Sequence, residues 1–349
     1  MFRLQSLSFH TVGAHAAATQ ATGPCAKRSS EIFLTFTKKS VIMMTNKTDR
    51  QKKGPYLSAF MHRTIADLTA AGKTRTAETY SSALNSFRRF LGDRDIRIGN
   101  ITDNLTLCYQ AWLKDCGLCP NSTSFYMRIL RAVYNRAADE GLIAQRRPFT
   151  RVYTGVDKTI KRAISLNTIR KVKEIRLDDR PDLAFARDIF LFSFYTRGMS
   201  FVDIAYLKKK NLKYGTLTYR RQKTGQTLKV KWEDCMQKIV DRYGDRDSAY
   251  ILPIITGGSK DMARNEYLKM SHRINRLLKK IGQMAGTQIP LTMYVARHTW
   301  ASIARNSHIP LQIISEGMGH NSESTTRIYL SEIDTSEIDK ANRQIIRLI

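Results

Sequence analysis

The chain has 349 residues, 42% of them hydrophobic, which is enough for two globular domains that each have a core. It carries 58 lysines and arginines against 30 aspartates and glutamates, a formal net charge of +28 that is spread along its whole length. Such an excess favours a polyanionic partner, and nucleic acid is a more common one than an acidic membrane surface. The longest apolar run covers only residues 189–195, far short of the roughly 20 residues that span a bilayer.

The cysteines are five in number and irregularly spaced, which is typical of reduced thiols in a cytosolic protein. They are Cys25, Cys108, Cys116, Cys119 and Cys235. Cys116 and Cys119 form a C-x-x-C pair, but no further ligands stand at a spacing that would complete a zinc site. The sequence also lacks the glycine-rich motifs that bind nucleotide phosphates. We therefore expect neither a cofactor nor a metal.

Residues 1–50 differ from the rest of the chain, because they are rich in Ala, Ser and Thr and their first acidic residue is Glu31. An acid-poor start can be a targeting peptide, but its apolar region is too weak for a secretion signal. We interpret the segment as a disordered extension, or as the result of a translation start placed too early. Met43 or Met44 would begin the well-patterned part of the chain.

Residues 56–145 carry the apolar periodicity of helices, and four amphipathic stripes in succession predict a small helical bundle. Basic side chains lie outside these stripes or in the loops, with few acids to balance them. We predict that they contact the phosphates of a nucleic acid: Lys73, Arg75, Arg88, Arg89, Arg128 and Arg131. A solvated polar face is the alternative for any one of them.

Residues 146–164 read as a basic linker with little periodicity, either a strap beside a duplex or a plain solvated connection. A second domain begins at Ser165. Pro181 suits the first turn of a long helix that covers residues 182–196 and ends at Arg197 and Gly198. A cation in this place, at the rim of a core, needs an anion or hydrogen-bond partners. An ion pair with Asp203 is the structural alternative to a functional role for Arg197.

The apolar period then changes from 3.6 to 2, which predicts three short strands over residues 212–214, 216–222 and 227–232. Lys223 lies at the second turn, and Arg220, Arg221 and Lys229 near it could each contact a phosphate. Residues 233–243 and 261–284 return to helical periodicity. The fold class is therefore mainly α with a small β-sheet.

Near the C-terminus, a cluster of donors follows Pro290. Thr292 can cap a helix on which Tyr294 and Arg297, three residues apart, share one face. Gly319 places His320 on a turn, and Tyr329 follows on a short helix expected to start at Ser322 or Ser324. This cluster is cationic, and Glu316 and Glu323 are its only acids. It suits a phosphate better than a metal or a carbonyl.

These residues resemble the C-terminal signature of the tyrosine recombinases, or phage integrases. That signature has an arginine, a histidine about two dozen residues later, and a nucleophilic tyrosine nine residues after that. Here His320 follows Arg297 by 23 residues, and Tyr329 follows His320 by nine. Tyr294 stands where most members carry histidine, as in some integrases of Bacteroides-type elements. The resemblance implies a SAM-like core-binding domain over residues 56–145 and a catalytic domain over residues 165–349.

The resemblance also implies the role of each residue. Arg197 and Arg297 would grip a DNA phosphodiester, and Tyr329 would attack its phosphorus. Lys223 would protonate the leaving oxygen, and Asp203 would support the site. His320 and Tyr294 would add hydrogen bonds. The expected activity is integration, excision or inversion of a DNA element through a 3′-phosphotyrosyl intermediate.

The expected partners follow from the same resemblance. They are double-stranded DNA, three further protomers in a synaptic tetramer, and possible accessory DNA-bending proteins in the bacterial cytoplasm, at the nucleoid. A C-terminal helix over residues 335–349, with Ile338, Ala341, Ile345, Ile346 and Leu348 along one stripe, is expected to dock on a neighbouring protomer. The alternatives are a DNA-binding protein of the same fold without catalysis, and an enzyme that relaxes DNA like a type IB topoisomerase.

Overall fold

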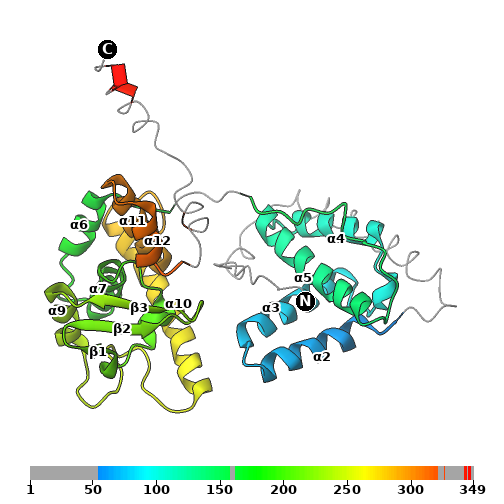
Figure 1. Cartoon of the computed structure of the whole chain (residues 1–349), viewed down its shortest axis with the longest axis horizontal. Coiled ribbons are helices and arrows are strands. Elements are labelled where there is room, and N and C mark those ends of the chain that lie inside the picture. Colours follow the sequence, from blue (N-terminus) through cyan, green and yellow to red (C-terminus); the bar gives the residue numbers. More distant parts are fainter. Residues whose placement is uncertain (1–53, 158–161, 321–325, 327–341, 344, 347–349) are drawn as a thin grey trace. The chain divides into compact units, whose positions relative to one another are not determined.

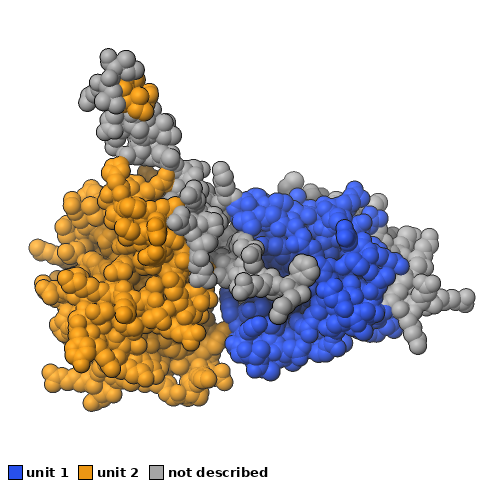
Figure 2. All heavy atoms as spheres, in the orientation of Figure 1, with its two compact units in different colours: residues 1–159 blue, residues 160–349 orange. Residues whose placement is uncertain are grey.

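The computed structural model describes residues 54–157, 162–320, 326, 342, 343, 345 and 346. The chain divides into two compact units, residues 1–159 and 160–349 (Figure 2). The boundary between them falls inside the predicted linker. None of the helices in the described ranges has the length and apolar character that a membrane crossing requires.

Unit 1 contains the four expected helices, and their bounds are α2 (Leu57–Ala70), α3 (Thr74–Phe90), α4 (Asp103–Asp115) and α5 (Pro120–Asp139) (Figure 1). A short 3-10 turn, η1 (Ile98–Asn100), precedes α4. The apolar stripes meet in one core, where the Tyr109 ring packs edge-on against Phe87 at a centroid distance of 4.8 Å. The Tyr109 hydroxyl donates to Ser86 Oγ at 2.8 Å, so this buried polar group keeps a partner.

The predicted linker is shorter than expected, because its first half belongs to unit 1. Phe149 and Val152 are buried in the core of the helical bundle. The Tyr153 backbone N–H donates to Gln110 Oε1 at 2.6 Å, and Ser124 Oγ donates to the Gly155 carbonyl at 2.6 Å. Two buried apolar residues and these hydrogen bonds hold the segment on the bundle, although the apolar residues show no helical period.

Unit 2 is mainly helical and has one small sheet, as predicted. Its helices are α6 (Leu166–Glu174), α7 (Pro181–Tyr195), α8 (Phe201–Ala205), α9 (Asp234–Tyr243), α10 (Lys260–Met284), α11 (Met293–Asn306) and α12 (Leu311–Gly317), with the 3-10 turn η2 (Lys209–Asn211) after α8. The strands β1 (Leu212–Lys213), β2 (Thr216–Arg220) and β3 (Thr227–Lys231) form an antiparallel sheet in the order β1-β2-β3.

Helix α7 is the centre of unit 2. It packs against α6, α9, α10 and α11, and most of its residues from Leu183 to Ser193 are buried. Each large apolar side chain that leaves water here, such as Ile189, Phe190 or Phe192, contributes about 1.5–3 kcal/mol. A helix held on several sides gives a fixed end from which a functional side chain can be presented.

Candidate active site

Arg297 lies on α11 and is the most connected of the predicted site residues. Only 4% of it is exposed. Its Nη1 donates to the Gly198 carbonyl at 2.7 Å, and its Nη2 donates to the Met318 carbonyl at 2.7 Å. The same Nη2 lies 2.9 Å from His320 Nε2. One buried guanidinium therefore joins the end of α7 to the turn after α12, and its position is fixed by both.

Helix α11 begins with a cap that the sequence did not reveal. Thr292 occupies the N-cap position, but its side chain makes no capping hydrogen bond, so the predicted cap is wrong. Instead Asn275 Oδ1, from α10, accepts the Met293 backbone N–H at 2.9 Å. An acceptor at a helix N-terminus satisfies one of its free N–H groups. Asn275 thereby helps to set the position of the helix that carries Arg297.

Arg197 ends α7 in an unusual backbone conformation. Its φ is 61°, and Gly198 follows with a φ of 72°. The Gly198 N–H donates to the Ser193 carbonyl at 2.8 Å, which closes the helix in a Schellman-like turn. A left-handed conformation costs a residue other than glycine about 1–2 kcal/mol. A side chain at Gly198 would place its Cβ 2.7 Å from Arg297 Cα. The absence of a side chain at Gly198 therefore lets the end of α7, which carries Arg197, pack directly against α11 at Arg297.

The Arg197 side chain is half-buried, and its Nη1 donates to the Lys229 carbonyl at 3.3 Å. The alternative ion pair with Asp203 is not formed. Asp203 is buried and accepts from Ser200 Oγ at 2.6 Å and from the Gln222 backbone N–H at 2.8 Å. It therefore holds the loop between β2 and β3, and its supporting role in a reaction stays a prediction.

Lys223 lies in this loop, as expected for the hairpin lysine. The residue as a whole is exposed, yet its pKa is lowered to about 8, first by loss of water around the ammonium and then by the charges of Arg221 and Arg297. An amine with such a pKa exchanges its proton readily near neutral pH.

His320 follows α12 on a tight turn in which Gly319 has a φ of 65°. Its Nδ1 lies 2.7 Å from Thr326 Oγ1, and Thr326 is fully buried. Because a guanidinium can only donate, His320 Nε2 accepts from Arg297, and a neutral ring then carries its proton on Nδ1 and donates it to Thr326. Sequence reasoning overlooked Thr326.

Tyr294 is half-buried on α11, and its ring packs edge-on against His298 at a centroid distance of 4.3 Å. Burial lowers the pKa of His298 to about 4, and the charges of Arg297 and Arg162 add to the effect. The ring of His298 is therefore neutral at pH 7 and offers Tyr294 an uncharged neighbour. Sequence reasoning overlooked His298, which directly follows Arg297, and the catalytic role of Tyr294 stays a prediction.

Several expected features lie outside the described residues. These are Tyr329, the short helix predicted to start at Ser322 or Ser324, most of the C-terminal helix over 335–349, and the first fifty residues with Cys25. Within the described part of the chain, no group of three His, Cys, Asp or Glu side chains is placed to hold a metal.

The predicted DNA contacts of unit 1 stay predictions. Lys73, Arg75, Arg89 and Arg131 are exposed, while Arg88 and Arg128 are half-buried. Arg75 is not in a loop, because α3 begins at Thr74, and it pairs with Glu78 at 3.2 Å. Part of its charge is therefore balanced, contrary to the expectation.

The two arginines after β2 differ from each other. Arg220 is exposed, as a phosphate contact should be, and its Nε donates to the Gly225 carbonyl at 2.9 Å. Arg221 is only 5% exposed, and its Nη1 donates to the Gly319 carbonyl. Its side chain is therefore engaged with the turn after α12, and its predicted phosphate contact stays a prediction.

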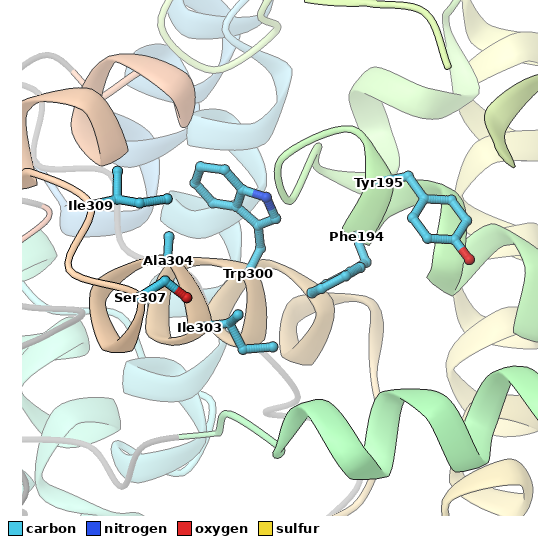
Figure 3. A pocket seen from close by; sticks show the side chains of 7 residues that line it. All are labelled: Phe194, Tyr195, Trp300, Ile303, Ala304, Ser307 and Ile309. Atoms are coloured by element: carbon cyan, nitrogen blue, oxygen red, sulfur yellow. The ribbon is translucent and has the colours of Figure 1, made fainter. Parts of the chain in front are cut away.

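An apolar pocket lies beside the site in unit 2 (Figure 3). It has a volume of about 320 Å³ and is lined by the C-terminal end of α7 and one side of α11, through Phe194, Tyr195, Trp300, Ile303, Ala304, Ser307 and Ile309. Ile345 and Ile346, near the C-terminus, are 60% and 59% exposed. The unit thus has both an apolar hollow and an uncovered apolar segment.

Both parts of the chain match known families. Residues 56–152 match the phage integrase SAM-like domain, and residues 182–335 match the phage integrase family. The chain is 23% identical over 286 residues to the tyrosine recombinase XerD of Pseudomonas aeruginosa, which covers 79% of this chain and 92% of that protein. It is 26% identical over 181 residues to the tyrosine recombinase XerA of Pyrococcus furiosus, over 50% of this chain and 58% of that protein.

Solved structures share the fold. A lambda integrase dimer bound to a COC′ core site has a TM-score of 0.61 at 16% identity and covers 79% of this chain and 95% of its own. The Tn1549 transposon integrase in complex with a circular intermediate DNA has a TM-score of 0.58 at 15% identity and covers 82% of this chain and 99% of its own.

Proposed function

We propose that this chain, which belongs to the phage integrase family of tyrosine recombinases, is a site-specific recombinase that cuts DNA strands and rejoins them to new partners. The observation that carries the proposal is the cluster around Arg297. This residue bonds the carbonyl next to Arg197 and the ring of His320, and its charge reaches Lys223. Two guanidiniums, an imidazole and an amine in one place suit a phosphodiester.

In the proposed cleavage step, Tyr329 Oη attacks the scissile phosphorus while Arg197 and Arg297 donate to its non-bridging oxygens. Donors that are already in place stabilise the negative charge of the transition state without reorganising. A Tyr329–phosphorus bond forms and the bond to the 5′ oxygen breaks. The result is a 3′-phosphotyrosine, and the 5′-hydroxyl of a partner strand then reverses the step and releases the protein.

Two groups handle the protons. The Lys223 ammonium donates a proton to the departing 5′ oxygen, a task for which its lowered pKa of about 8 is suited. The tautomer of His320 leaves a lone pair on Nε2, which faces Arg297 in the free protein. When the Arg297 N–H that faces Nε2 bonds a phosphate oxygen instead, with the guanidinium staying in place, Nε2 can accept the Tyr329 proton, and a phenol with an ordinary pKa of about 10 becomes a nucleophile.

A covalent adduct is the decisive observation. The full chain is incubated with sheared chromosomal DNA of its source cell, protein is denatured, and DNA that stays attached is sequenced. The recovered site is then rebuilt as a nicked suicide duplex, from which the cleaved end diffuses away. We expect a protein–DNA band on a denaturing gel for the natural chain and none for Tyr329→Phe.

The alternative functions predict other results. A DNA-binding protein without catalysis would give salt-sensitive binding but no adduct with any duplex. An enzyme that relaxes DNA would form adducts at many unrelated sequences and remove supercoils from any plasmid. Only recombination joins the ends of two different duplexes at one recovered sequence.

We also propose that the active assembly is a tetramer on DNA in which the C-terminal segment of one protomer fills the apolar pocket of the next. The exposed Ile345 and Ile346 and the pocket beside Trp300 support this pairing, because both lose unfavourable contact with water when they meet. Ile345→Asp with Ile346→Asp should leave half-site binding intact and abolish the larger complexes on gel-shift and light-scattering measurements. Unchanged complexes would contradict the pairing.

Two further predictions belong to this proposal. Bringing distant sites together would call for accessory proteins that bend DNA, and purified chain alone should then recombine short duplexes more readily than sites far apart on a plasmid. We also expect the protein to act on DNA in the bacterial cytoplasm, at the nucleoid.

A further inference from the structure

The loop between β2 and β3 and the turn after α12 lie about a hundred residues apart in the sequence, yet they touch. Leu228 and Gln226 of the hairpin crowd Gly319 so closely that a Cβ there would fall 2.7 Å from Leu228 Cδ1 and 3.3 Å from Gln226 Oε1. Gly319 also has a left-handed φ of 65°. The hairpin and the turn are therefore fitted to each other, with no room for a side chain between them.

A buried arginine joins the two segments. Arg221 is 5% exposed, and its Nη1 donates to the Gly319 carbonyl. Its backbone N–H donates to the Gln226 carbonyl at 2.8 Å, and its own carbonyl accepts from the Gly225 N–H at 2.8 Å. The side chain thus reaches the turn while the main chain closes the loop that contains Lys223.

Guanidiniums hold three successive residues of the turn. Arg297 bonds the Met318 carbonyl and the His320 ring, and Arg221 bonds the Gly319 carbonyl between them. Without Arg221, the Gly319 carbonyl would lose its donor inside the protein, a costly state that the turn would relieve by moving. His320 is the next residue and would move with it.

We propose that Arg221 is a positioning residue that fixes the loop bearing Lys223 and the turn bearing His320 relative to each other. This inference rests on the proposed recombinase function. In this role Arg221 acts through Lys223 and His320, the two groups that would contact the DNA. A shift of about 1 Å in such groups can slow a reaction about a hundredfold.

The test is the cleavage rate constant of Arg221→Met at saturating protein, measured on the suicide duplex recovered with the natural chain. We expect a loss of at least about thirtyfold, with DNA affinity in a gel shift changed less than about threefold. Arg221→Lys keeps the charge and one donor and should recover part of the rate. A cleavage rate equal to that of the natural chain in Arg221→Met would overturn the inference.

A matched control separates positioning from a general loss of stability. Arg187 is another largely buried arginine of unit 2, and it donates to the Ile175 carbonyl at 2.7 Å and to Asp188. Arg187→Met removes hydrogen bonds to Ile175 and Asp188, which belong to neither the hairpin loop nor the turn. It should lower the melting temperature and leave the cleavage rate constant of the folded protein unchanged. An equal rate loss in both variants would assign the effect of Arg221 to folding.

A second substrate shows whether both groups are affected. In a duplex with sulfur in place of the bridging 5′ oxygen, the leaving thiolate needs no proton, so a defect that acts through Lys223 disappears. We expect Lys223→Ala to recover fully on this duplex and Arg221→Met to recover only in part, since His320 stays displaced. Full recovery, or none, would show that Arg221 serves one group alone and would overturn the joint role.

The pH profile provides a further readout. The positive charge of Arg221 contributes to the lowered pKa of Lys223, so its removal should move the alkaline limb of the rate profile toward higher pH. Arg221→Lys should keep the limb in place. If the natural chain forms no adduct at all, the recombinase proposal fails; if it does and these variants behave like it, only the role of Arg221 fails.

Discussion

The two units bury different kinds of polar side chain. Among the described residues, those of unit 1 are hydroxyl groups: Thr64, Ser86, Thr106, Thr123 and Ser124. Unit 2 buries hydroxyl groups too, but it also encloses four charged residues, Asp188, Asp203, Arg221 and Arg297. A buried hydroxyl needs one or two hydrogen bonds, whereas a buried charge needs several or a counter-charge.

The difference follows the division of labour that we propose. Three of the four buried charges hold the candidate site, where donors must be in place before a phosphate arrives. Unit 1 keeps its predicted DNA-contact arginines exposed or half-buried, where they can meet a DNA backbone one phosphate at a time. Changes at the buried charges of the candidate site should therefore alter both stability and chemistry, while changes at the predicted DNA-contact arginines of unit 1 should alter affinity alone.

Arg297→Gln is expected to have the largest effect. It removes the charge from the site and leaves the Gly198 and Met318 carbonyls short of a donor. We expect the cleavage rate constant to fall by about a thousandfold or more. The free energy of unfolding of unit 2 should fall by about 2–4 kcal/mol, since each unsatisfied buried group costs about 1–3 kcal/mol.

Suicide-substrate kinetics and urea denaturation measure the two effects separately. A variant that loses cleavage while its unfolding free energy stays at the natural value would show that the carbonyl contacts of Arg297 add nothing to the fold. The comparison between the units would then hold for catalysis only.

Asp188→Asn tests a buried charge away from the site. Asp188 accepts from Arg187 at 2.7 Å, from Arg242 at 2.6 Å and from the Tyr243 hydroxyl at 2.9 Å. Replacing the carboxylate weakens all three bonds, and we expect a loss of about 2 kcal/mol in unfolding free energy because the arginines keep partial access to water.

The cleavage rate constant of the folded Asp188→Asn protein should be unchanged at a temperature well below its midpoint. Thermal unfolding followed by circular dichroism, with cleavage assayed on the same sample, checks both statements. A large rate loss in fully folded protein would mean that the α7–α9 contacts reach the site.

Substitution of Arg197 by glycine is expected to have a smaller effect on stability, and a favourable one compared with alanine. Its left-handed φ of 61° disfavours any residue with a Cβ, and glycine relieves that strain. Arg197→Gly should therefore be more stable than Arg197→Ala by about 1 kcal/mol, and both should lose cleavage. Equal unfolding free energies in the two variants would show that the turn relaxes when the guanidinium is removed.

Local patterns in the sequence predicted most of the fold. The stripes that became α7, α9 and α10 have their expected bounds to within about two residues, because a helix face is encoded by neighbours three and four apart. The two strands on either side of the Lys223 loop were predicted from an apolar period of two. The resemblance to the tyrosine recombinases selected Arg197, Arg297 and His320, and the structure places them near one another.

The missed residues act through contacts between distant segments. Asn275 caps α11 from α10, and Arg221 meets Gly319 across the hairpin. An arginine that follows a strand looks like a surface cation until the partner segment is known, so the sequence did not predict its contact with Gly319. The burial of Phe149 in the core of unit 1 was missed for a similar reason. A single apolar residue in a loop shows no periodicity from which its burial could be predicted.

Arg128→Gln in unit 1 should have the smallest effect. Arg128 is half-buried, and its pKa is lowered by burial and by the nearby charge of Arg131. Its positive charge therefore adds little to the stability of unit 1. We expect a loss of several-fold in affinity for the recovered site at low salt. The slope of log K against log salt should fall by about one, and the unfolding free energy should stay within about 0.5 kcal/mol.

Arg63→Gln is the matched control for this last change. Arg63 is an exposed arginine of the same unit that pairs with Glu140 and lies over the Phe60 ring at 4.8 Å. The substitution Arg63→Gln also removes one positive charge, but from a side chain outside the predicted DNA contacts. The salt slope of this variant should therefore match that of the natural chain. If both variants lower the slope equally, affinity follows net charge, and the contact face assigned to α5 is wrong. If only Arg128→Gln lowers the salt slope, the DNA-contact face of unit 1 includes this part of α5.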